Sequence, residues 1–229
     1  TLALDFHNLR KGLAELLRAL DLAKAQAKAD GAAPAEKIAR VLHSQLESQP
    51  ATTKSKPPQT APSFDLRKNT KQLTEADVKQ MIEKYDFYCG EYSWTEAFKN
   101  PDGKGLANQF QPQQNGKLVY DAATGLTWQQ GGSENYMTYA DAQKYVDKLN
   151  RERFAGFSDW RLPTLEEAMS LMEPQKSSNG LYIDAVFDAK QRYIWTADKA
   201  ASGAWYVNFN DGLCHWYGLR FNYYVRVVR

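Results

Sequence analysis

The sequence predicts an α+β domain that follows an N-terminal helical hairpin and a proline-rich linker. Three observations carry this prediction. The first 49 residues hold eleven alanines and one aromatic residue, whereas all six tryptophans lie beyond residue 90. From residue 117 onward, short runs that are typical of strands alternate with helix-capping motifs. Beyond residue 190, runs of aromatic and β-branched residues follow one another between glycine-containing turns, and this order is typical of the α+β class.

The overall composition excludes several classes of protein. The 229 residues carry 29 basic and 27 acidic side chains, so the chain lacks the excess of positive charge that nucleic-acid binding requires. No stretch approaches the roughly 18 consecutive apolar residues of a membrane span, and the mean hydropathy is −0.63. We therefore expect no nucleic-acid partner and no membrane span.

The cysteine and histidine content predicts no metal site and no cofactor. Cys89 and Cys214 are too few for a disulfide framework or for a zinc site built from thiolates. The three histidines, His7, His43 and His215, lie far apart in the sequence. We therefore expect no cluster of metal ligands from these residue types.

Residues 1–49 are predicted to form a helical hairpin or connector. Leucines at positions 9, 13, 16, 17 and 20 lie on one face of a helix, which we place at about residues 4–28. After Gly31 and Pro34, a second apolar pattern predicts a helix that folds back on the first. This region is also the candidate segment for oligomerisation.

Residues 50–73 are predicted to be a linker. The run from residue 50 to residue 62 holds four of the nine prolines and no large apolar residue, which is typical of an extended, semi-rigid connection. Because the sequence begins with Thr1 rather than methionine, we also expect a further domain upstream of the hairpin.

Residues 74–229 are predicted to form the folded domain. Three threonines, each followed by an acidic residue three positions later, predict helices that begin after Thr74, Thr138 and Thr164. The second helix is expected to end near Asn150, and residues 89–116 are predicted to be a loop. Strands are predicted at residues 118–121, 126–129, 193–197, 204–209, 213–217 and 223–228.

Several motifs resemble the bacterial DUF1566 family. The most specific is Gly-Phe-Ser-Asp-Trp-Arg-Leu-Pro-Thr at residues 156–164. The run Asp-Ala-Ala-Thr-Gly-Leu-Thr-Trp at residues 121–128 and the ending over residues 224–229 fit the same family. The likeness covers roughly residues 74–229 and leaves residues 1–73 unmatched. It implies a C-type lectin-like fold of the formylglycine-generating-enzyme type.

The resemblance implies three competing functional classes. The same fold is found at the end of a bacterial collagen-like adhesin and in variable proteins of diversity-generating retroelements. The classes are therefore an oxidase-like enzyme, a lectin or adhesin with a fixed ligand, and a diversified receptor. In a diversified receptor, the retroelement rewrites the last strands and loops.

The residues disfavour the enzyme class. The formylglycine-generating enzymes are understood to bind copper through two nearby C-terminal cysteines, because thiolates suit Cu(I). Here Cys214 stands alone in that region, and nothing in the sequence requires Cys89 to lie beside it. His215 follows Cys214 directly, and neighbouring residues of a strand point to opposite faces, which is poor geometry for a Cys–His pair. We predict that the protein is not an enzyme.

Calcium-dependent sugar binding also lacks its residues. The C-type lectins that bind sugar this way resemble one another in a Glu-Pro-Asn or Gln-Pro-Asp loop and in a later Trp-Asn-Asp. Glu-Pro-Gln at residues 173–175 and Phe-Asn-Asp at residues 209–211 are near matches only. No dense acidic loop supplies the about six to eight oxygens that calcium needs. A calcium-independent glycan or a protein ligand stays open.

The last 26 residues have an unusual composition. Residues 204–229 hold eight aromatic residues but no Lys, Glu, Gln or Met. Burial in strands depletes these residue types as well. In the retroelement proteins that the chain resembles, mutagenesis of an asparagine codon yields every residue type except Lys, Glu, Gln, Met and Trp. Between Asn208 and Tyr223 only Trp216 falls outside that set, so we interpret Trp216 as part of the scaffold.

This segment is predicted to form a ligand-binding surface. Aromatic side chains offer a large contact area for few torsions, and Asn, Asp and Arg add adaptable hydrogen bonds. Residues 213–217 do not alternate apolar with polar side chains, as a half-exposed strand would. The predicted contact residues are Asp211, Leu213, Cys214, His215, Tyr217, Leu219, Arg220, Phe221, Asn222 and Tyr223.

The neighbouring apolar residues are predicted to form the core. The family pattern places them inside the domain, and we expect the charges of Asp159 and Arg161 to pair with each other, because a buried charge must be partnered. The predicted core residues are Trp128, Trp160, Trp195, Trp205, Val207, Phe209, Tyr224, Val225 and Val227.

The sequence thus predicts a receptor-like protein that binds a ligand and is diversified by a retroelement. The alternative is a lectin or adhesin module with fixed specificity for glycans or glycosaminoglycans. The partner is a protein or a glycan, and both a cytoplasmic sensor and a cell-surface receptor stay open.

Overall fold

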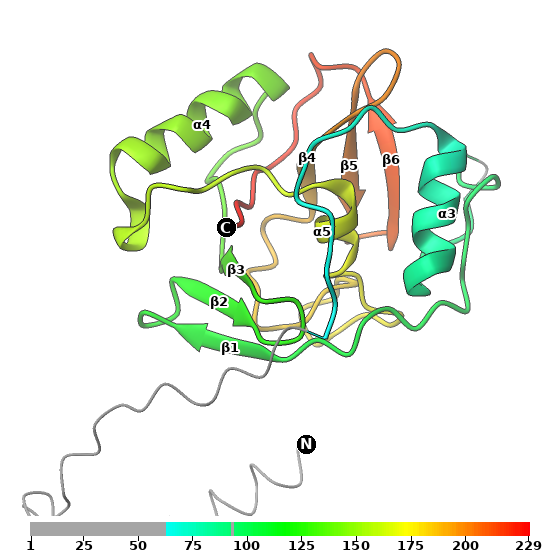
Figure 1. Ribbon diagram of the computed structural model, residues 1–229, viewed down its shortest axis with the longest axis horizontal. Helices are drawn as coiled ribbons and strands as arrows, with labels where there is room; N and C mark the ends of the chain where they lie inside the picture. Colours follow the sequence, from blue (N-terminus) through cyan, green and yellow to red (C-terminus); the bar gives the residue numbers. More distant parts are fainter. Residues whose placement is uncertain (1–62, 93) are drawn as a thin grey trace, which may run out of the picture. The chain divides into compact units, whose positions relative to one another are not determined.

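The computed structural model describes residues 63–92 and 94–229 (Figure 1). The predicted helical hairpin of residues 1–49 and the proline-rich run of residues 50–62 lie outside the described residues. In the described part, helices combine with two small antiparallel sheets of three strands each. The fold is therefore mixed α+β, as the sequence predicts.

The three predicted helices are present, and each begins at its predicted cap. They are α3 (Glu75–Tyr85), α4 (Tyr139–Arg151) and α5 (Leu165–Met169), and a short 3-10 turn, η1 (Phe154–Gly156), follows α4. In each helix the capping threonine hydroxyl accepts a hydrogen bond from the third backbone amide of the helix, at 3.2 to 3.3 Å. Such a cap satisfies a donor that has no partner within the helix.

The first sheet contains β1 (Phe110–Gln113), β2 (Leu118–Asp121) and β3 (Leu126–Gln129) in that order. β2 and β3 have the predicted bounds. The prediction of a continuous loop over residues 89–116 is wrong, because β1 pairs with β2. β1 is a polar edge strand that contains Pro112, and only an edge position tolerates proline in a strand.

The second sheet contains β4 (Tyr193–Lys199), β5 (Ala204–Asn208) and β6 (Leu213–Tyr217), all antiparallel. These strands agree with the prediction to within two residues at each end. Figure 1 shows α3 and α4 on opposite sides of the domain, with α3 nearer to β6.

The second sheet lies between two hydrophobic cores. On one face, Trp205 and Val207 pack with buried side chains of α3 and α5. On the other face, Trp195 packs with the first turn of α4, where its ring lies 5.5 Å from the ring of Tyr139, edge to face. Both faces of the sheet therefore carry aromatic side chains.

The predicted C-terminal strand over residues 223–228 is wrong as a regular strand. This segment is extended, but it makes isolated bridges to four different partners. Near its start it pairs with β4, where the Trp195 amide donates to the Tyr224 carbonyl at 3.0 Å. At its end it pairs with β3, where the Thr127 amide donates to the Arg229 carbonyl at 3.0 Å. The segment connects the two sheets, so no single partner strand continues along it (Figure 1).

The domain begins before residue 74, so the predicted linker boundary needs correction. Leu66 and Leu73, both in the predicted linker, are buried in the core that contains α3. The Leu73 amide donates to the carbonyl of Lys199 in β4 at 2.8 Å. Two isolated leucines among polar residues are a weak sequence signal for the start of a domain. Each nevertheless buries apolar area and so stabilises the domain.

The predicted core is confirmed, but the predicted ion pair is not. All nine residues predicted as core are buried. Arg161 pairs with the fully buried Glu167, whose carboxylate oxygens lie 2.5 and 2.6 Å from the guanidinium. Asp159 pairs instead with Arg229 at 2.8 Å, near the surface. Glu167, in the first turn of α5, is therefore the charged partner that the partly buried Arg161 requires.

Candidate ligand-binding surface

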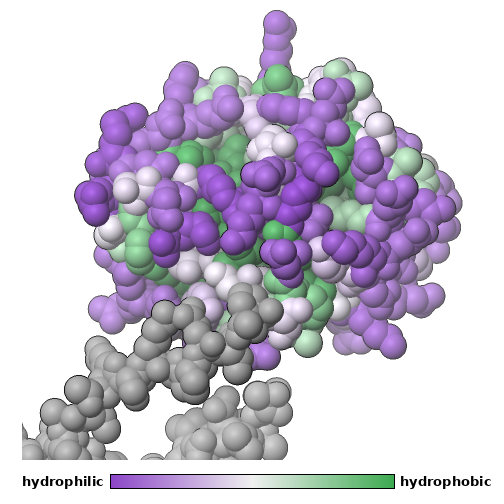
Figure 2. Space-filling view, in the orientation of Figure 1, coloured by the Kyte–Doolittle hydropathy of each residue, from purple (hydrophilic) through white to green (hydrophobic). Residues whose placement is uncertain are grey.

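Most of the exposed large hydrophobic side chains of the domain belong to two segments, the loop after α3 and β6 with the loop that follows it. In the described residues the exposed large hydrophobics are Tyr92, Trp94, Tyr136, Tyr217, Leu219 and Phe221. Two come from the loop after α3, and three come from β6 and the loop that follows it. The face of the domain seen in Figure 2 is mainly hydrophilic, with hydrophobic areas broken up by polar side chains.

The rings of these segments contact one another in a continuous series. Tyr92 stacks on Trp94 at 5.2 Å, and Trp94 stacks on His215 at 6.2 Å, both with planes 18° apart. His215 meets Tyr217 edge to face at 6.2 Å, and Tyr217 lies 4.1 Å from Phe221. We call these five residues the aromatic surface.

The aromatic surface is supported from below by two tyrosines. Tyr206 of β5 pairs with His215 across the sheet, and its ring lies 6.5 Å from that of Tyr217. Tyr223 stacks on Tyr206 at 4.2 Å and meets the buried Trp195 edge to face at 4.6 Å. Burial, and then the neighbouring Tyr223, raise the pKa of Tyr206, so this phenol stays neutral. The support is therefore uncharged and tightly packed.

His215 is held in its neutral form within this surface. Burial lowers its pKa below the ordinary value of 6.5, and the negative charge of Glu75 opposes this effect only in part. In the described structure its Nδ1 atom is buried and has no hydrogen-bond partner. Protonation would place an unpaired donor there, which is costly.

We expect stability to fall in acid partly through His215. Because the folded-state pKa is below 6.5, the unfolded chain binds the proton first as the pH falls through 6.5, so the free energy of unfolding decreases. The contribution is fully present above 6.5. Replacing His215 by glutamine should remove this part of the pH dependence in denaturation curves between pH 7 and pH 5. Identical slopes for the two proteins would contradict the assignment.

The structure exposes eight of the ten predicted contact residues at least partly. Five are exposed, namely Tyr217, Leu219, Arg220, Phe221 and Asn222, and three are partly buried, namely Asp211, His215 and Tyr223. The carboxylate of Asp211 accepts hydrogen bonds from the side chains of Asn208 and Asn210 at 2.7 and 2.8 Å. Asp211 therefore shapes the turn between β5 and β6.

The prediction that Leu213 and Cys214 contact a ligand is wrong. Both side chains are fully buried in the core that contains α3. They begin β6, where the strand is covered by the loop after α3, and the Gly90 amide donates to the Gly212 carbonyl at 2.7 Å. Apolar and polar side chains do not alternate over residues 213–217, because β6 is buried at its first residues and exposed at its last.

Sequence reasoning missed Tyr92, Trp94 and Tyr206. Tyr92 and Trp94 are more than 120 positions from His215, and no periodicity links them. Their only sequence signal is an aromatic cluster in an otherwise polar loop. Tyr206 lies in the predicted strand of residues 204–209 but is not among the predicted core residues; it is buried, and its ring packs beneath the aromatic surface.

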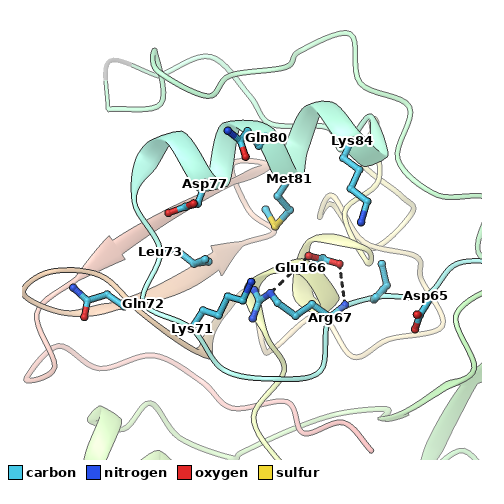
Figure 3. Close-up of a pocket in the computed structure, with 11 residues that line it drawn as sticks. Asp65, Arg67, Lys71, Gln72, Leu73, Asp77, Gln80, Met81, Lys84 and Glu166 are labelled. Atoms are coloured by element: carbon cyan, nitrogen blue, oxygen red, sulfur yellow. Dashed lines mark hydrogen bonds and ion pairs between the residues drawn. The ribbon is translucent and has the colours of Figure 1, made fainter.

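A separate cavity lies between α3 and the segment before it (Figure 3). Its volume is about 500 Å³, and it is lined by residues 65–67 and 71–73, four side chains of α3, and Glu166. Arg67 bonds the buried Asp198 with both terminal nitrogens, at 2.9 and 2.6 Å, and its backbone amide donates to Glu166 at 2.9 Å. None of the predicted contact residues lines this cavity.

The lining of this cavity contains no serine, cysteine or histidine, and two of its three acidic side chains accept hydrogen bonds. Asp77, for example, accepts a hydrogen bond from the Thr74 amide at 2.8 Å and so caps α3. Across residues 63–92 and 94–229, no group of three or more His, Cys, Asp or Glu side chains is placed to hold a metal ion.

Comparison with known proteins finds a similarity for part of the chain. None of the helices that the structure describes is long and apolar enough to cross a membrane. No curated protein shows significant similarity to the chain. The family model of the Lcl C-terminal domain matches residues 117–229, which include β6 and Phe221 but not Trp94, and which include only Glu166 of the residues that line the cavity beside α3. The region from β2 to the C-terminus is thus similar to the Lcl C-terminal domain.

Proposed function

We propose that the protein is a receptor-like module of C-type lectin-like fold that binds its ligand through the aromatic surface. The observation that carries this proposal is the continuous series of rings from Tyr92 to Phe221. Within it, the residues Trp94 and Phe221 are 48% and 50% exposed. A contiguous exposed apolar patch of this kind typically marks an interaction site.

The physical chemistry of the surface suits binding. Tyrosine, tryptophan and histidine bury much area while losing few torsions, and they dominate the binding energy of many interfaces. Here the rings pack on one another and on β5, so little conformational entropy is lost when a ligand docks. Arg220 and Asn222 are exposed in the same loop and offer hydrogen bonds at its rim. The proposed role is binding without catalysis.

The diversified version of this proposal assigns the variable positions to residues 208–223. Eight of the ten predicted contact residues have exposed area, as a surface that is rewritten and selected would need. Deep sequencing of the 3′ end of the gene in a clonal population tests it. Substitutions confined to codons with template adenines, together with a nearby template repeat and reverse-transcriptase gene, would support it. An invariant 3′ end would contradict it.

The fixed-specificity version is favoured by a different observation. Leu213 and Cys214 fall within the same run but are fully buried. Randomising either position would place polar or oversized side chains in the core, which costs stability. A lectin or adhesin module that binds one glycan or protein has no such conflict.

A binding screen tests the ligand-binding proposal directly. The chain of 229 residues would be applied to a glycan array, including glycosaminoglycans, and to a displayed protein library. We expect at least one ligand that binds the wild-type protein and a control variant with Lys148 and Glu152 replaced by alanine, since both residues lie at the exposed end of α4. The same ligand should not bind a Trp94→Ala variant with comparable affinity. Absence of any ligand on both panels, or equal binding by Trp94→Ala, would contradict the proposal.

A further inference from the structure

The two cysteines meet inside the core, although more than half of the chain lies between them. Cys89 and Cys214 are both fully buried, and both are free thiols in this structure. Their side chains are within hydrogen-bonding contact of each other. The sequence alone did not require this contact.

The backbone around both cysteines is held in place by hydrogen bonds. The Cys89 amide donates to the Asn100 carbonyl at 3.1 Å, and the Asn100 amide donates back to Cys89 at 2.9 Å. Next to this pair, the Gly90 amide donates to the Gly212 carbonyl at 2.7 Å. Cys214 pairs with Val207 within the sheet. The backbone beside each cysteine is therefore held by hydrogen bonds, and the Gly90–Gly212 bond joins the segment of Cys89 to the residue before β6.

The two thiols differ in acidity. Burial raises the pKa of Cys214 well above its ordinary value. The hydrogen bond from Cys214 lowers the pKa of Cys89, because it stabilises the thiolate at that position. Cys89 is thus the more acidic of the two thiols in the folded chain, and a thiolate is the form that attacks a disulfide.

We propose that Cys89 and Cys214 are a modification site at which an intramolecular disulfide ties the loop after α3 to β6. The oxidant is a low-molecular-weight disulfide such as oxidised glutathione. The Cys89 thiolate attacks one glutathione sulfur, which breaks the glutathione disulfide, releases one glutathione thiolate and forms a mixed disulfide. Cys214 then loses its proton and attacks the Cys89 sulfur, and the second glutathione leaves. Two protein thiols are oxidised, and one glutathione disulfide is reduced to two thiols.

The disulfide would fix the loop that carries part of the aromatic surface. Cys89 lies three residues before Tyr92 and five before Trp94, and Trp94 stacks on His215, the residue after Cys214. A covalent link between residues 89 and 214 joins the two segments directly beneath this ring contact. The disulfide itself does not depend on the proposed function.

The test is to refold the full chain in a buffer of reduced and oxidised glutathione and to count its thiols. After refolding, the chain is unfolded in guanidinium, alkylated and digested with trypsin. We expect the peptides of residues 85–99 and 200–220 to be joined to each other, with no alkylated cysteine until a reductant is added. Two alkylated cysteines, or cysteines bonded only to glutathione, would overturn the proposal.

The single variants Cys89→Ala and Cys214→Ala serve as matched controls. Each retains one thiol that alkylates fully, so its melting temperature should not respond to reductant. The wild-type protein should melt roughly 5–15 °C lower after reduction, because the cross-link closes a very long loop of the unfolded chain. Hydrogen exchange in residues 85–99 should also quicken on reduction. An unchanged melting temperature and unchanged exchange would overturn the claim that the link holds the loop.

Discussion

Replacing Tyr217 and Phe221 together by alanine is expected to weaken ligand binding by about a hundredfold or more. Each side chain is at least 40% exposed, and the two rings lie 4.1 Å apart at the end of the aromatic surface. Truncating a dominant contact residue of an interface typically costs about 2 kcal/mol or more, and each 1.4 kcal/mol is about tenfold in affinity. Titration calorimetry with a ligand from the binding screen measures the change.

The melting temperature of this double variant should fall by no more than about 3 °C, because exposed side chains contribute little to stability. Tyr223 is left unchanged, since it stacks on Tyr206 and packs on Trp195 and its loss would disturb the core. The matched control carries the Lys148→Ala and Glu152→Ala changes on α4. A binding loss that appears equally in the control, or that follows an equal loss of folding, would remove these residues from the binding surface.

Replacing Arg67 by methionine is expected to reduce the free energy of unfolding by about 3–5 kcal/mol. Asp198 is fully buried, and both its oxygens bond the Arg67 guanidinium, at 2.9 and 2.6 Å. The backbone amides of Lys71 and Leu165 also donate to this carboxylate, each at 2.7 Å. Removing the arginine leaves a buried anion without its counter-charge, which is among the most costly changes in a core. Urea denaturation followed by circular dichroism measures the loss.

A second variant separates the charge from the packing. Asn in place of Asp198 keeps an oxygen for a backbone amide but carries no charge, so the double variant Arg67→Met, Asp198→Asn should be more stable than Arg67→Met alone. A loss below about 1 kcal/mol in Arg67→Met would show that Asp198 does not depend on this partner. No improvement in the double variant would show that packing, and not charge, dominates.

The local part of the fold can be predicted from the sequence. The three helices begin at threonines whose hydroxyls accept bonds within the next three residues, so the signal lies inside one short segment. The hairpin of β2 and β3 is equally local, and Gly125 supplies the positive φ of 72° that its turn needs. The burial of most tryptophans follows from the large apolar area of this side chain. These features depend on neighbours in the sequence.

The rest of the fold depends on contacts between distant residues. β1 exists because β2 offers an edge, although three of the four residues of β1 are glutamine or proline. The last residues change partners from β4 to β3, so no alternation of a regular strand marks them. The burial of Leu213 and Cys214 depends on the loop that begins near Cys89. These contacts join residues that are far apart in the sequence, so no pattern within a short segment predicts them.

The candidate site divides in the same way. Tyr217, Phe221 and His215 could be predicted, because the composition of the last residues is unusual. Trp94 could not, since its contact with His215 is formed only when the loop after α3 folds over β6. The aromatic surface combines two segments, and only the C-terminal one has an unusual composition. The sequence therefore predicts that segment and not the loop after α3.

Hydrogen-exchange mapping of the bound ligand tests the central claim most directly. Exchange would be compared in the free protein and in the complex with a ligand from the binding screen. We predict slower exchange in residues 91–95 and 215–223 together, because both segments contribute rings to the aromatic surface. Protection confined to α3 and residues 65–73, around the cavity in Figure 3, would instead place the binding site there and contradict the account.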